Sequence, residues 1–437
     1  MSFAVYPEYE SYRKTGVEWV GAIPSSWEVR RGKWLFKRMD RPIRSEDKIV
    51  TCFRDGVVTL RANRRTEGFT NAMKEHGYQG IRKGDLVIHA MDAFAGAIGV
   101  SDSDGKSTPV YSACTPRVAG TVDPTFYAYY MRHIALSGLL VAMAKGIRER
   151  STDFRFSDFA DLNLAAPTIY EQKTIVAFLD KKCATIDEAV RIKEEQIKLL
   201  RERRQILIQQ AVTRGMNPDA PMKDSGIDWI GEIPAHWGTR KLSHLGMVGN
   251  GSTPSRDNRA FWDTGNIPWL NSSKVNDFII KGAEQFVTAK AKRECHLPSI
   301  EPGDLVMGIT GQGKTRGMVA ICEIETTINQ HLAYIRVKAP DVLNYYLLHF
   351  FSASYKWLRS QSDSSGSTKG AITCDDIKNY IVVVPPLLEQ KAIVTHVENE
   401  AEKIDNAISI KQDQIAKLKE YKTSLINAAV TGKIKVI

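Results

Sequence analysis

The stretch PTIYEQKTIVAFLDKKCATIDEAVRIKEEQIKLL begins at residue 167 and runs on to AVT at residue 213. It returns from residue 385 as PPLLEQKAIVTHVENEAEKIDNAISIKQDQIAKL and again ends in AVT, at residue 431. In both copies apolar residues recur at heptad spacing, and Glu, Gln, Lys and Arg, which favour helices, fill the other faces. The pattern predicts two long helices that pack as a coiled coil. The predicted seam contains Ile186, Val190, Ile197, Leu200, Leu207, Ile404, Ile408, Ile415, Leu418 and Leu425.

The charges within this seam favour an antiparallel pair. Lys193 and Arg204 of the first copy match Lys411 and Lys422 of the second, 218 positions later. A parallel pair in register would stack two layers of like charge, and an antiparallel pair avoids both. We therefore expect antiparallel helices, in which about 30 residues span about 45 Å. The alternative is that each helix packs only on its own neighbouring domain.

A second repeat lies ahead of each helix. GVEWVGAIPSSWEVRR at residues 16–31 matches GIDWIGEIPAHWGTRK at residues 226–241, at an offset of 210, and both copies keep two tryptophans at one spacing. A fainter echo pairs KGDLVI at 83–88 with PGDLVM at 302–307. The chain is therefore one domain-plus-helix unit written twice. The predicted domains are 1–166 and 217–384, and the predicted helix regions are 167–216 and 385–437.

Both predicted domains alternate short β-like runs with Gly, Ser and Asn turns. The clearest runs are DLVIHA (85–90), PVYSACTPRV (109–118), HLAYIRV (331–337) and NYIVVV (379–384), and a helical stretch lies near the end of each domain, at 126–144 and 342–359. We expect an α+β fold with two domains in tandem repeat, two long antiparallel coiled-coil helices and pseudo-twofold symmetry.

Composition places the 437-residue chain among soluble globular proteins, with 43% hydrophobic and 25% charged residues. The net charge of +10 leans towards a polyanionic partner. No apolar stretch approaches the roughly 18 residues of a membrane span, and the start of the sequence lacks a signal-peptide core. The six cysteines form no CxxC pair, which is typical of small buried hydrophobes in a reducing cytosol.

Basic and amide residues gather in the predicted loops, and these side chains suit contacts with base edges and phosphates. Any one of them is as readily a solvated loop residue, so the hypothesis rests on the set. The candidate DNA-binding residues are Arg54, Arg61, Arg64, Arg65 and Lys74 in the first domain, and Ser252, Thr253, Arg256, Asn258, Arg259, Asn271, Ser272, Lys274, Gln312, Lys314, Arg316, Gln330 and His331 in the second.

One catalytic pattern requires separate consideration. GITGQGKT at residues 308–315 fits the P-loop formula G-x-x-x-x-G-K-[ST]. A true P-loop opens into a helix whose N-terminus holds the phosphates, whereas RGMVAICEIETTI follows here and favours a strand. Nucleotide binding by this loop is kept as the alternative function, and a loop in which Lys314 and Arg316 face a phosphate backbone is preferred.

Other catalytic patterns are missing from the sequence. The nine histidines form no HExxH pair, and no GxSxG elbow or amino-methyltransferase signature occurs. Glu420 and Lys422 match a nuclease ExK only in letters, because they lie on the predicted coiled coil. No catalytic residue and no metal ligand is predicted.

The order of these elements resembles the specificity (S) subunit of type I restriction–modification systems, the HsdS family. The resemblance rests on the repeated GVEWVGAIPSSW and EQ-to-AVT segments and on GSTPSRDN, NIPWLNSS, GITGQGKTRG and PPLLEQKAIV, and it covers nearly the whole chain. It implies that each variable domain is a target recognition domain for one half of a split, asymmetric DNA sequence, with the two helices as a spacer.

The same resemblance implies partners and cofactors. Double-stranded DNA would be the ligand, two methyltransferase (M) subunits would methylate adenine N6 with S-adenosylmethionine, and restriction (R) subunits would use ATP and magnesium. No cofactor is then expected on this chain, which would have no active site. The outer faces of the helices are candidate M-subunit docking surfaces. A coiled-coil scaffold that binds only protein is a further alternative.

Overall fold

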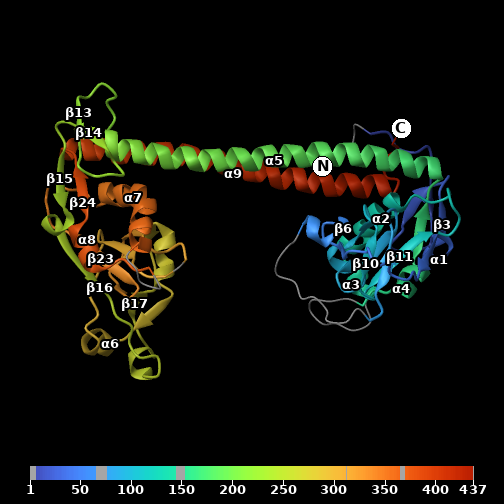
Figure 1. Cartoon of the computed structure of the whole chain (residues 1–437), viewed down its shortest axis with the longest axis horizontal. Helices are drawn as coiled ribbons and strands as arrows, with labels where there is room; N and C mark the ends of the chain where they lie inside the picture. Colours follow the sequence, from blue (N-terminus) through green and yellow to red (C-terminus); the bar gives the residue numbers. More distant parts are fainter. Residues whose placement is uncertain (1–5, 65–75, 144–152, 312, 365–369, 437) are drawn as a thin grey trace. The chain divides into compact units, whose positions relative to one another are not determined.

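The structure, a computed structural model, describes residues 6–64, 76–143, 153–311, 313–364 and 370–436. The chain forms two compact units (Figure 1). The first unit joins Met1–Glu194 to Gln412–Ile437, and the second spans Glu195–Lys411. Each unit therefore contains one globular domain and half of each long helix, so the division falls within the helices and not at their ends.

The globular domain of the first unit is built on a four-stranded antiparallel sheet in the order β4-β11-β8-β9. Leu86 and Ile88 of this sheet share one hydrophobic core with Phe126 and Tyr127 of α2. The sheet strands are β4 (Phe36–Met39), β8 (Leu86–His89), β9 (Ile98–Val100) and β11 (Tyr111–Pro116). Two-stranded pairs are β1 (Tyr12–Lys14) with β2 (Ala22–Pro24), β3 (Glu28–Arg31) with β12 (Asn163–Ala166), β5 (Val50–Cys52) with β6 (Val58–Leu60), and β7 (Gln79–Ile81) with β10 (Gly105–Ser107). The helices are α1 (Gly32–Leu35), α2 (Pro124–Leu136), α3 (Leu139–Met143) and α4 (Phe156–Asp161).

The globular domain of the second unit has a five-stranded sheet in the order β16-β23-β20-β21-β18 and a three-stranded sheet in the order β19-β17-β22. The first comprises β16 (Gly246–Asn250), β18 (Ile279–Ile280), β20 (Leu305–Gly308), β21 (Val319–Cys322) and β23 (Leu332–Val337). The second comprises β17 (Ile267–Leu270), β19 (Gln285–Val287) and β22 (Thr327–Ile328). Two pairs complete the strands, β13 (Met222–Asp224) with β14 (Glu232–Pro234) and β15 (Gly238–Lys241) with β24 (Ile381–Val384). The short helices are α6 (Ala289–Glu294) and α8 (Cys374–Asn379), and α7 (Asn344–Ser364) is longer.

The sequence predicted these local elements well. The runs at 85–90, 109–118, 331–337 and 379–384 contain β8, β11, β23 and β24, and the stretch at 342–359 lies mainly in α7. The helix expected at 126–144 is interrupted, because Gly138 between α2 and α3 adopts a positive φ of 88°. Glycine tolerates this left-handed conformation, and it ends the first helix.

The two repeated stretches form the long helices α5 (Ile169–Arg214) and α9 (Leu387–Val430), of 46 and 44 residues. Both helices lie within the predicted helix regions, and they extend beyond the seam of about 30 residues to the EQ motifs at their starts. Six predicted seam residues are buried and four are half-buried. The buried ones are Ile186, Ile197, Ile404, Ile408, Ile415 and Leu425, and the half-buried ones are Val190, Leu200, Leu207 and Leu418.

Polar contacts within the first unit establish that its helix segments are antiparallel. Lys422 Nζ lies 2.7 Å from both carboxylate oxygens of Asp187, and Lys193 Nζ donates to Gln414 Oε1 at 2.7 Å. As the residue number rises along α5, the number of the partner on α9 falls. The predicted antiparallel orientation is confirmed.

The second unit repeats these contacts at the positions related by the offset of 218, with the roles of α5 and α9 exchanged. Arg204 Nη1 lies 3.5 Å from Asp405 Oδ1, and Lys411 Nζ donates to Gln196 Oε1 at 2.7 Å. Lys193 and Lys411 thus each have a glutamine of the opposite helix as a hydrogen-bond partner. Because the same partners recur, the two units share one mode of helix pairing.

The repeated tryptophan segments pack against the starts of the long helices. Trp27 Nε1 donates to Glu171 Oε1 at 3.2 Å in the first unit, and Trp237 Nε1 donates to Glu389 Oε2 at 2.9 Å in the second. Both indoles are 1% exposed. The repeated tryptophan and the glutamate of the EQ motif are therefore the two sides of one contact, which forms once in each unit.

The glutamine of each EQ motif binds the main chain of its own domain. Gln172 Oε1 accepts from Asp123 N at 2.8 Å, and Gln172 Nε2 donates to Pro167 O at 2.9 Å. Gln390 likewise accepts from Leu343 N and donates to Pro385 O, both at 2.8 Å. Buried amides satisfied on both sides fix the angle at which the helix leaves the domain. The motif is structural in both units.

The cysteines were predicted to be buried, and this holds for four of them, whereas Cys295 and Cys374 are half-buried. All six are free, and Cys52, Cys114, Cys183 and Cys322 are buried. Within the described residues, no helix has both the length and the apolarity needed to cross a membrane.

Candidate nucleic-acid interface

Three loops of the second unit converge at one edge of the three-stranded sheet. β17 and β22 run parallel, with Leu270 opposite Ile328. Ser252 N donates to Ile328 O at 3.2 Å, and Asn329 N donates to Leu270 O at 3.0 Å. The loops that follow β16, β17 and β22 are thereby tied together through main-chain bonds. Candidate residues from three distant stretches of sequence meet at this edge.

A chain of polar side chains runs across these loops. Thr253 Oγ1 donates to Gln330 Oε1, Gln330 Nε2 lies 3.2 Å from His331 Nε2, and His331 Nδ1 lies 2.6 Å from Thr310 Oγ1. Gln330 and His331 are exposed, whereas both threonines are half-buried. Amide and imidazole groups held in this way offer donors and acceptors of the kind that read base edges.

A guanidinium stacked on two indoles lies on the same loop. Arg256 Cζ lies 3.8 Å from the ring centroid of Trp262 and 5.2 Å from that of Trp269, and Arg256 Nη2 donates to Gln285 Oε1 at 2.7 Å. The indoles also hold the loop main chain, because Trp262 Nε1 donates to Ser255 O and Trp269 Nε1 to Ser252 O. An exposed, flat and pre-oriented guanidinium is well suited to a phosphate or a guanine edge.

Three of the other candidates have a local structural role or an acidic partner. Asn258 and Asn271 accept hydrogen bonds from the main chain two residues on, at 3.1 and 2.9 Å. Lys274 lies 3.0 Å from Asp277 and 3.2 Å from Glu284, and hydrogen bonds to these two carboxylates raise the pKa of Lys274. Arg259 is exposed. Lys274 therefore meets protein carboxylates and is less suited to a phosphate contact than Arg256.

The P-loop-like stretch does not form a P-loop. Gly317 N donates to Gly308 O at 2.7 Å, and strand β21 follows, so the described residues of this loop include no helix N-terminus to hold phosphates. The alternative of nucleotide binding by a P-loop at 308–315 is therefore wrong. Arg316, expected on the surface, is 2% exposed and belongs to the core, while Lys314 is exposed. Gln312 lies outside the described residues.

In the first unit the described candidate arginines lie in the turn of the β5–β6 hairpin and directly after it. Arg54 Nη2 lies 2.8 Å from Asp92 Oδ1, and Arg64 Nη1 lies 2.7 Å from Asp55 Oδ2. Arg64 also lies over the ring of Phe53, with 4.7 Å between Cζ and the centroid. Both guanidinium groups are exposed. They form a basic but internally paired surface.

Arg61 is the third candidate arginine of this unit that the structure describes, and its Nε donates to Thr51 Oγ1 at 3.2 Å. Arg65 and Lys74 lie outside the described residues. A half-buried pair of side chains that the sequence did not predict, Arg132 and His89, lies beside this hairpin. Arg132 donates to Arg54 O at 3.1 Å, and burial lowers the pKa of Arg132. His89 packs on Tyr111 with 4.6 Å between ring centroids, and burial lowers its pKa too.

Sequence reasoning also missed Trp262, Trp269 and Thr310. The two tryptophans stand within a few residues of the candidate loops, and the interleaving of aromatic with basic residues was the available signal. Thr310 carried no such signal, because only the fold brings β20 beside the loop of His331.

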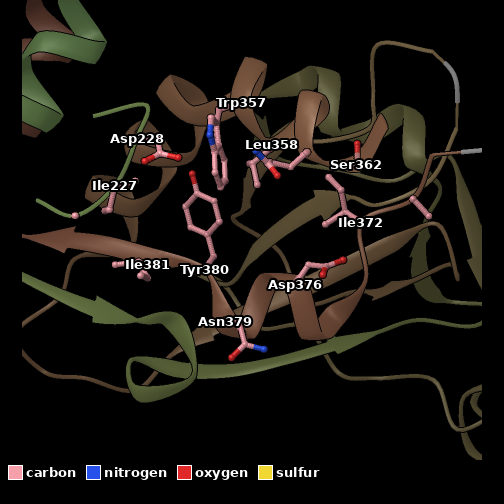
Figure 2. A pocket seen from close by; sticks show the side chains of 13 residues that line it. Ile227, Asp228, Trp357, Leu358, Ser362, Ile372, Asp376, Asn379, Tyr380 and Ile381 are labelled. Carbon is pink, nitrogen blue, oxygen red and sulfur yellow. The ribbon is translucent and has the colours of Figure 1, made fainter. Parts of the chain in front are cut away.

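A cavity of about 570 Å³ lies elsewhere in the second unit, between α7, α8 and the loop at Ile227 (Figure 2). Trp357 and Tyr380 meet there edge to face, with 5.5 Å between ring centroids. The carboxylates of Asp228 and Asp376 line the cavity as well. This acidic lining does not suit the DNA backbone, and no candidate residue belongs to it. Among the described residues, no group of three or more His, Cys, Asp or Glu could hold a metal ion.

The chain is similar in sequence to known proteins. Residues 234–420 match the Type I restriction modification DNA specificity domain. Over 445 residues the chain is 22% identical to the putative type I restriction enzyme MjaX specificity subunit of Methanocaldococcus jannaschii, covering 98% of this chain and 97% of that protein. It is 21% identical over 165 residues to the EcoR124I/EcoR124II specificity subunit of Escherichia coli, covering 38% and 40%.

Two solved structures share the fold. One, from work on complex assembly and conformational transition of the type I R-M system, has a TM-score of 0.69 at 16% identity and covers 93% of this chain and 98% of its own. The other, the HsdS subunit from Thermoanaerobacter tengcongensis, has a TM-score of 0.54 at 17% identity and covers 94% and 98%.

Proposed function

Because this chain belongs to the specificity subunits of type I restriction–modification systems, we propose that its two domains read the two halves of a bipartite duplex DNA sequence. The observation that carries the proposal is the convergence of Thr253, Gln330 and His331 beside Arg256 stacked on Trp262. Gln330 and His331 supply the base-edge contacts, and Arg256 supplies the contact to phosphate or guanine.

The half-sites differ in sequence, on this proposal, because the frames of the two units agree while their loops do not. The first unit presents paired arginines on a hairpin, and the second presents amide, imidazole and stacked guanidinium groups. A helix of 46 residues is about 69 Å long. This exceeds the roughly 34–36 Å of one DNA turn, so the long helices would set a gap of unread base pairs between the half-sites.

Catalysis is assigned to the partners. Methyltransferase (M) subunits would bind S-adenosylmethionine and methylate adenine N6, and R subunits would bind ATP and magnesium and restrict unmodified DNA. This chain would supply only recognition and the frame on which those subunits assemble.

Exposed apolar residues repeated at the helix offset support M-subunit docking. Tyr170 and Leu388, 218 positions apart, are 78% and 79% exposed, the highest fractions among the large hydrophobic residues described. Ile192 and Ile410, related by the same offset, are 44% and 58% exposed. Exposed apolar side chains at matched positions are typical of binding surfaces. Two copies of one surface would bind two copies of one partner.

The DNA proposal is tested by expressing the chain with its M partner and sequencing the methylated adenines of the host. A gapped motif with two unlike halves is expected. Gln330→Ala should relax only the half read by the second domain, and Lys378→Ala, on α8 beside the acidic cavity, is the charge-changing control. An ungapped motif, or relaxation of both halves by Gln330→Ala, would contradict it. If the chain is only a protein scaffold, methylation will not depend on Gln330.

Docking is tested separately by pull-down of the M subunit. Tyr170→Asp and Leu388→Asp should each remove one of two bound M subunits, and the double variant should remove both. The exposed Leu199→Asp is the matched control, since position 417 of the second helix is a lysine and this residue is not repeated. Unchanged stoichiometry in the double variant would move the docking surface elsewhere.

A further inference from the structure

A second cavity of the second unit, of about 620 Å³, has no role in the proposed reading of DNA. It lies between α7 and the parts of α5 and α9 that belong to this unit. Arg201, Arg204, Lys314 and His349 are among its polar lining residues. The volume falls within the roughly 300–1,000 Å³ of small-molecule sites.

Three buried polar atoms at this cavity lack hydrogen-bond partners within the described residues. They are both ring nitrogens of His349 and the Nε of Arg204. His349 is 4% exposed, and burial, followed by the charge of Arg204, lowers its pKa to about 4. A neutral imidazole offers one donor and one acceptor. Buried polar groups are nearly always satisfied in folded proteins, so this set indicates a missing polar ligand.

The charge of the lining indicates the sign of that ligand. Arg201, Arg204 and Lys314 are opposed by one carboxylate, Asp405, which lies 3.5 Å from Arg204. A histidine that stays neutral adds no charge. The cavity therefore carries a surplus of positive charge and favours an anion with oxygen acceptors.

The remaining walls are aromatic and apolar. Phe278 and His349 lie with 5.8 Å between ring centroids, and Tyr355 lines the same cavity. Ile208 and Val397 complete an apolar side. Such walls suit a flat ring, and an inorganic anion alone would leave most of the cavity unfilled.

We propose that this cavity binds a small phosphate ester with an aromatic body, of the size of a mononucleotide. The arginines and Lys314 face the phosphate, and the aromatic walls hold the ring. This proposed site differs from a P-loop, although both would use Lys314. The loop at Gly313 and Lys314 is held by α7, and no helix N-terminus takes part in the proposed site. Tyr355 Oη donates to Lys314 O at 2.7 Å, and Arg359 Nη1 donates to Gly313 O at 2.6 Å.

Isothermal titration of the full-length chain with adenosine monophosphate, adenosine and orthophosphate tests the proposal. Adenosine monophosphate should bind at least about tenfold more tightly than either of its parts, since only it meets both walls. Arg201→Ala and Lys314→Ala should each weaken its binding about tenfold, the loss expected for one charge-assisted hydrogen bond. Both side chains are exposed at the cavity mouth, so folding should survive and can be checked by circular dichroism.

Matched controls lie close by. Arg203 is an exposed arginine two positions from Arg201 and outside the lining, and Lys356 is an exposed lysine on α7 outside it. Their alanine variants should bind adenosine monophosphate as wild type does. Equal weakening by the controls, orthophosphate binding as tight as that of the nucleotide, or no binding at millimolar concentration would overturn the proposal. Displacement of the nucleotide by excess non-specific duplex would assign the cavity to a backbone phosphate of DNA and overturn it too.

Discussion

Lys422 Nζ lies 2.7 Å from both carboxylate oxygens of Asp187. The equivalent ion pair in the second unit joins Arg204 to Asp405 at 3.5 Å, where Arg204 corresponds to Lys422 and Asp405 to Asp187 at the repeat offset of 218. Neither ion pair joins two residues of the same helix, since each links α5 to α9 within one unit. An ion pair that recurs with both partners exchanged between helices fixes direction and register together. The repeat in the sequence thus corresponds to a repeat in the contacts.

Reversing one charge of this pair should destabilise the first unit. Lys422→Glu places a carboxylate beside Asp187, and we expect a loss of about 1 kcal/mol, because Asp187 is exposed, Lys422 is only half-buried, and pairs near the surface contribute little. Adding Asp187→Lys should restore most of the loss. Urea unfolding of both single variants and the double variant gives the coupling energy. A double variant no more stable than Lys422→Glu would contradict the register.

Removing the acceptor of a buried indole should be more costly. In Glu171→Ala, Trp27 Nε1 loses its partner inside the core, for which we expect a loss of about 1–3 kcal/mol. Glu171→Gln keeps an acceptor oxygen and should lose less. Chemical denaturation followed by tryptophan fluorescence measures both. If the glutamine variant is as unstable as the alanine variant, the charge of Glu171 matters and the hydrogen bond does not.

How much of this could be read from the sequence depended on periodicity and repetition. The seam, the antiparallel orientation and the tryptophan segments follow from patterns that occur twice. The orientation was predicted because a parallel pair would place Lys193 beside Lys411. The partner of Trp27 could not be predicted, because Glu171 lies 144 positions away and its letter also suits a helix start. Arg316 was misplaced because a charged residue in a Gly-rich loop favours the surface, while the fold turns it into the core.

The candidate loops were predicted by residue type and not by contact. Thr253 lies 77 positions from Gln330, and the two meet only because β16, which precedes Thr253, pairs with β23, which follows His331. Lys274 shows the converse, since the sequence did not reveal that Asp277 and Glu284 both pair with it. Composition selects side chains that can bind DNA, and pairing within the fold decides which of them are available.

Two substitutions at the proposed interface should separate base reading from backbone binding. Gln330→Ala should cost about 1–3 kcal/mol at one base pair and leave other positions unaffected. Arg256→Ala, if its guanidinium meets phosphate, should weaken binding uniformly and reduce the slope of log K against log salt by about 1. Gel shifts of the chain with its M partner, on targets with single base changes and at several salt concentrations, measure both. A salt slope unchanged in Arg256→Ala with relaxed specificity would assign this residue to a guanine edge.

The buried histidine of the second cavity should make the second unit sensitive to acid. Burial lowers the pKa of His349 from its ordinary 6.5 to about 4. Between these values the unfolded chain binds a proton that the folded chain does not, so stability rises with pH across this window. The contribution is complete above about pH 6.5 and is lost as pH falls towards 4, with a total of roughly 2–4 kcal/mol.

His349→Leu removes this proton uptake, so its unfolding free energy should depend less steeply on pH between 4 and 6.5 than that of wild type, by up to about 1.4 kcal/mol per pH unit. Urea unfolding at half-unit steps of pH measures the slopes. The exposed His244→Leu controls for the loss of one histidine from the unfolded chain. Parallel slopes for wild type and His349→Leu would show that His349 takes up its proton equally in both states. A ligand that fills the cavity should raise the unfolding free energy of the wild type. It should leave the pH dependence of the unfolding free energy of His349→Leu unchanged.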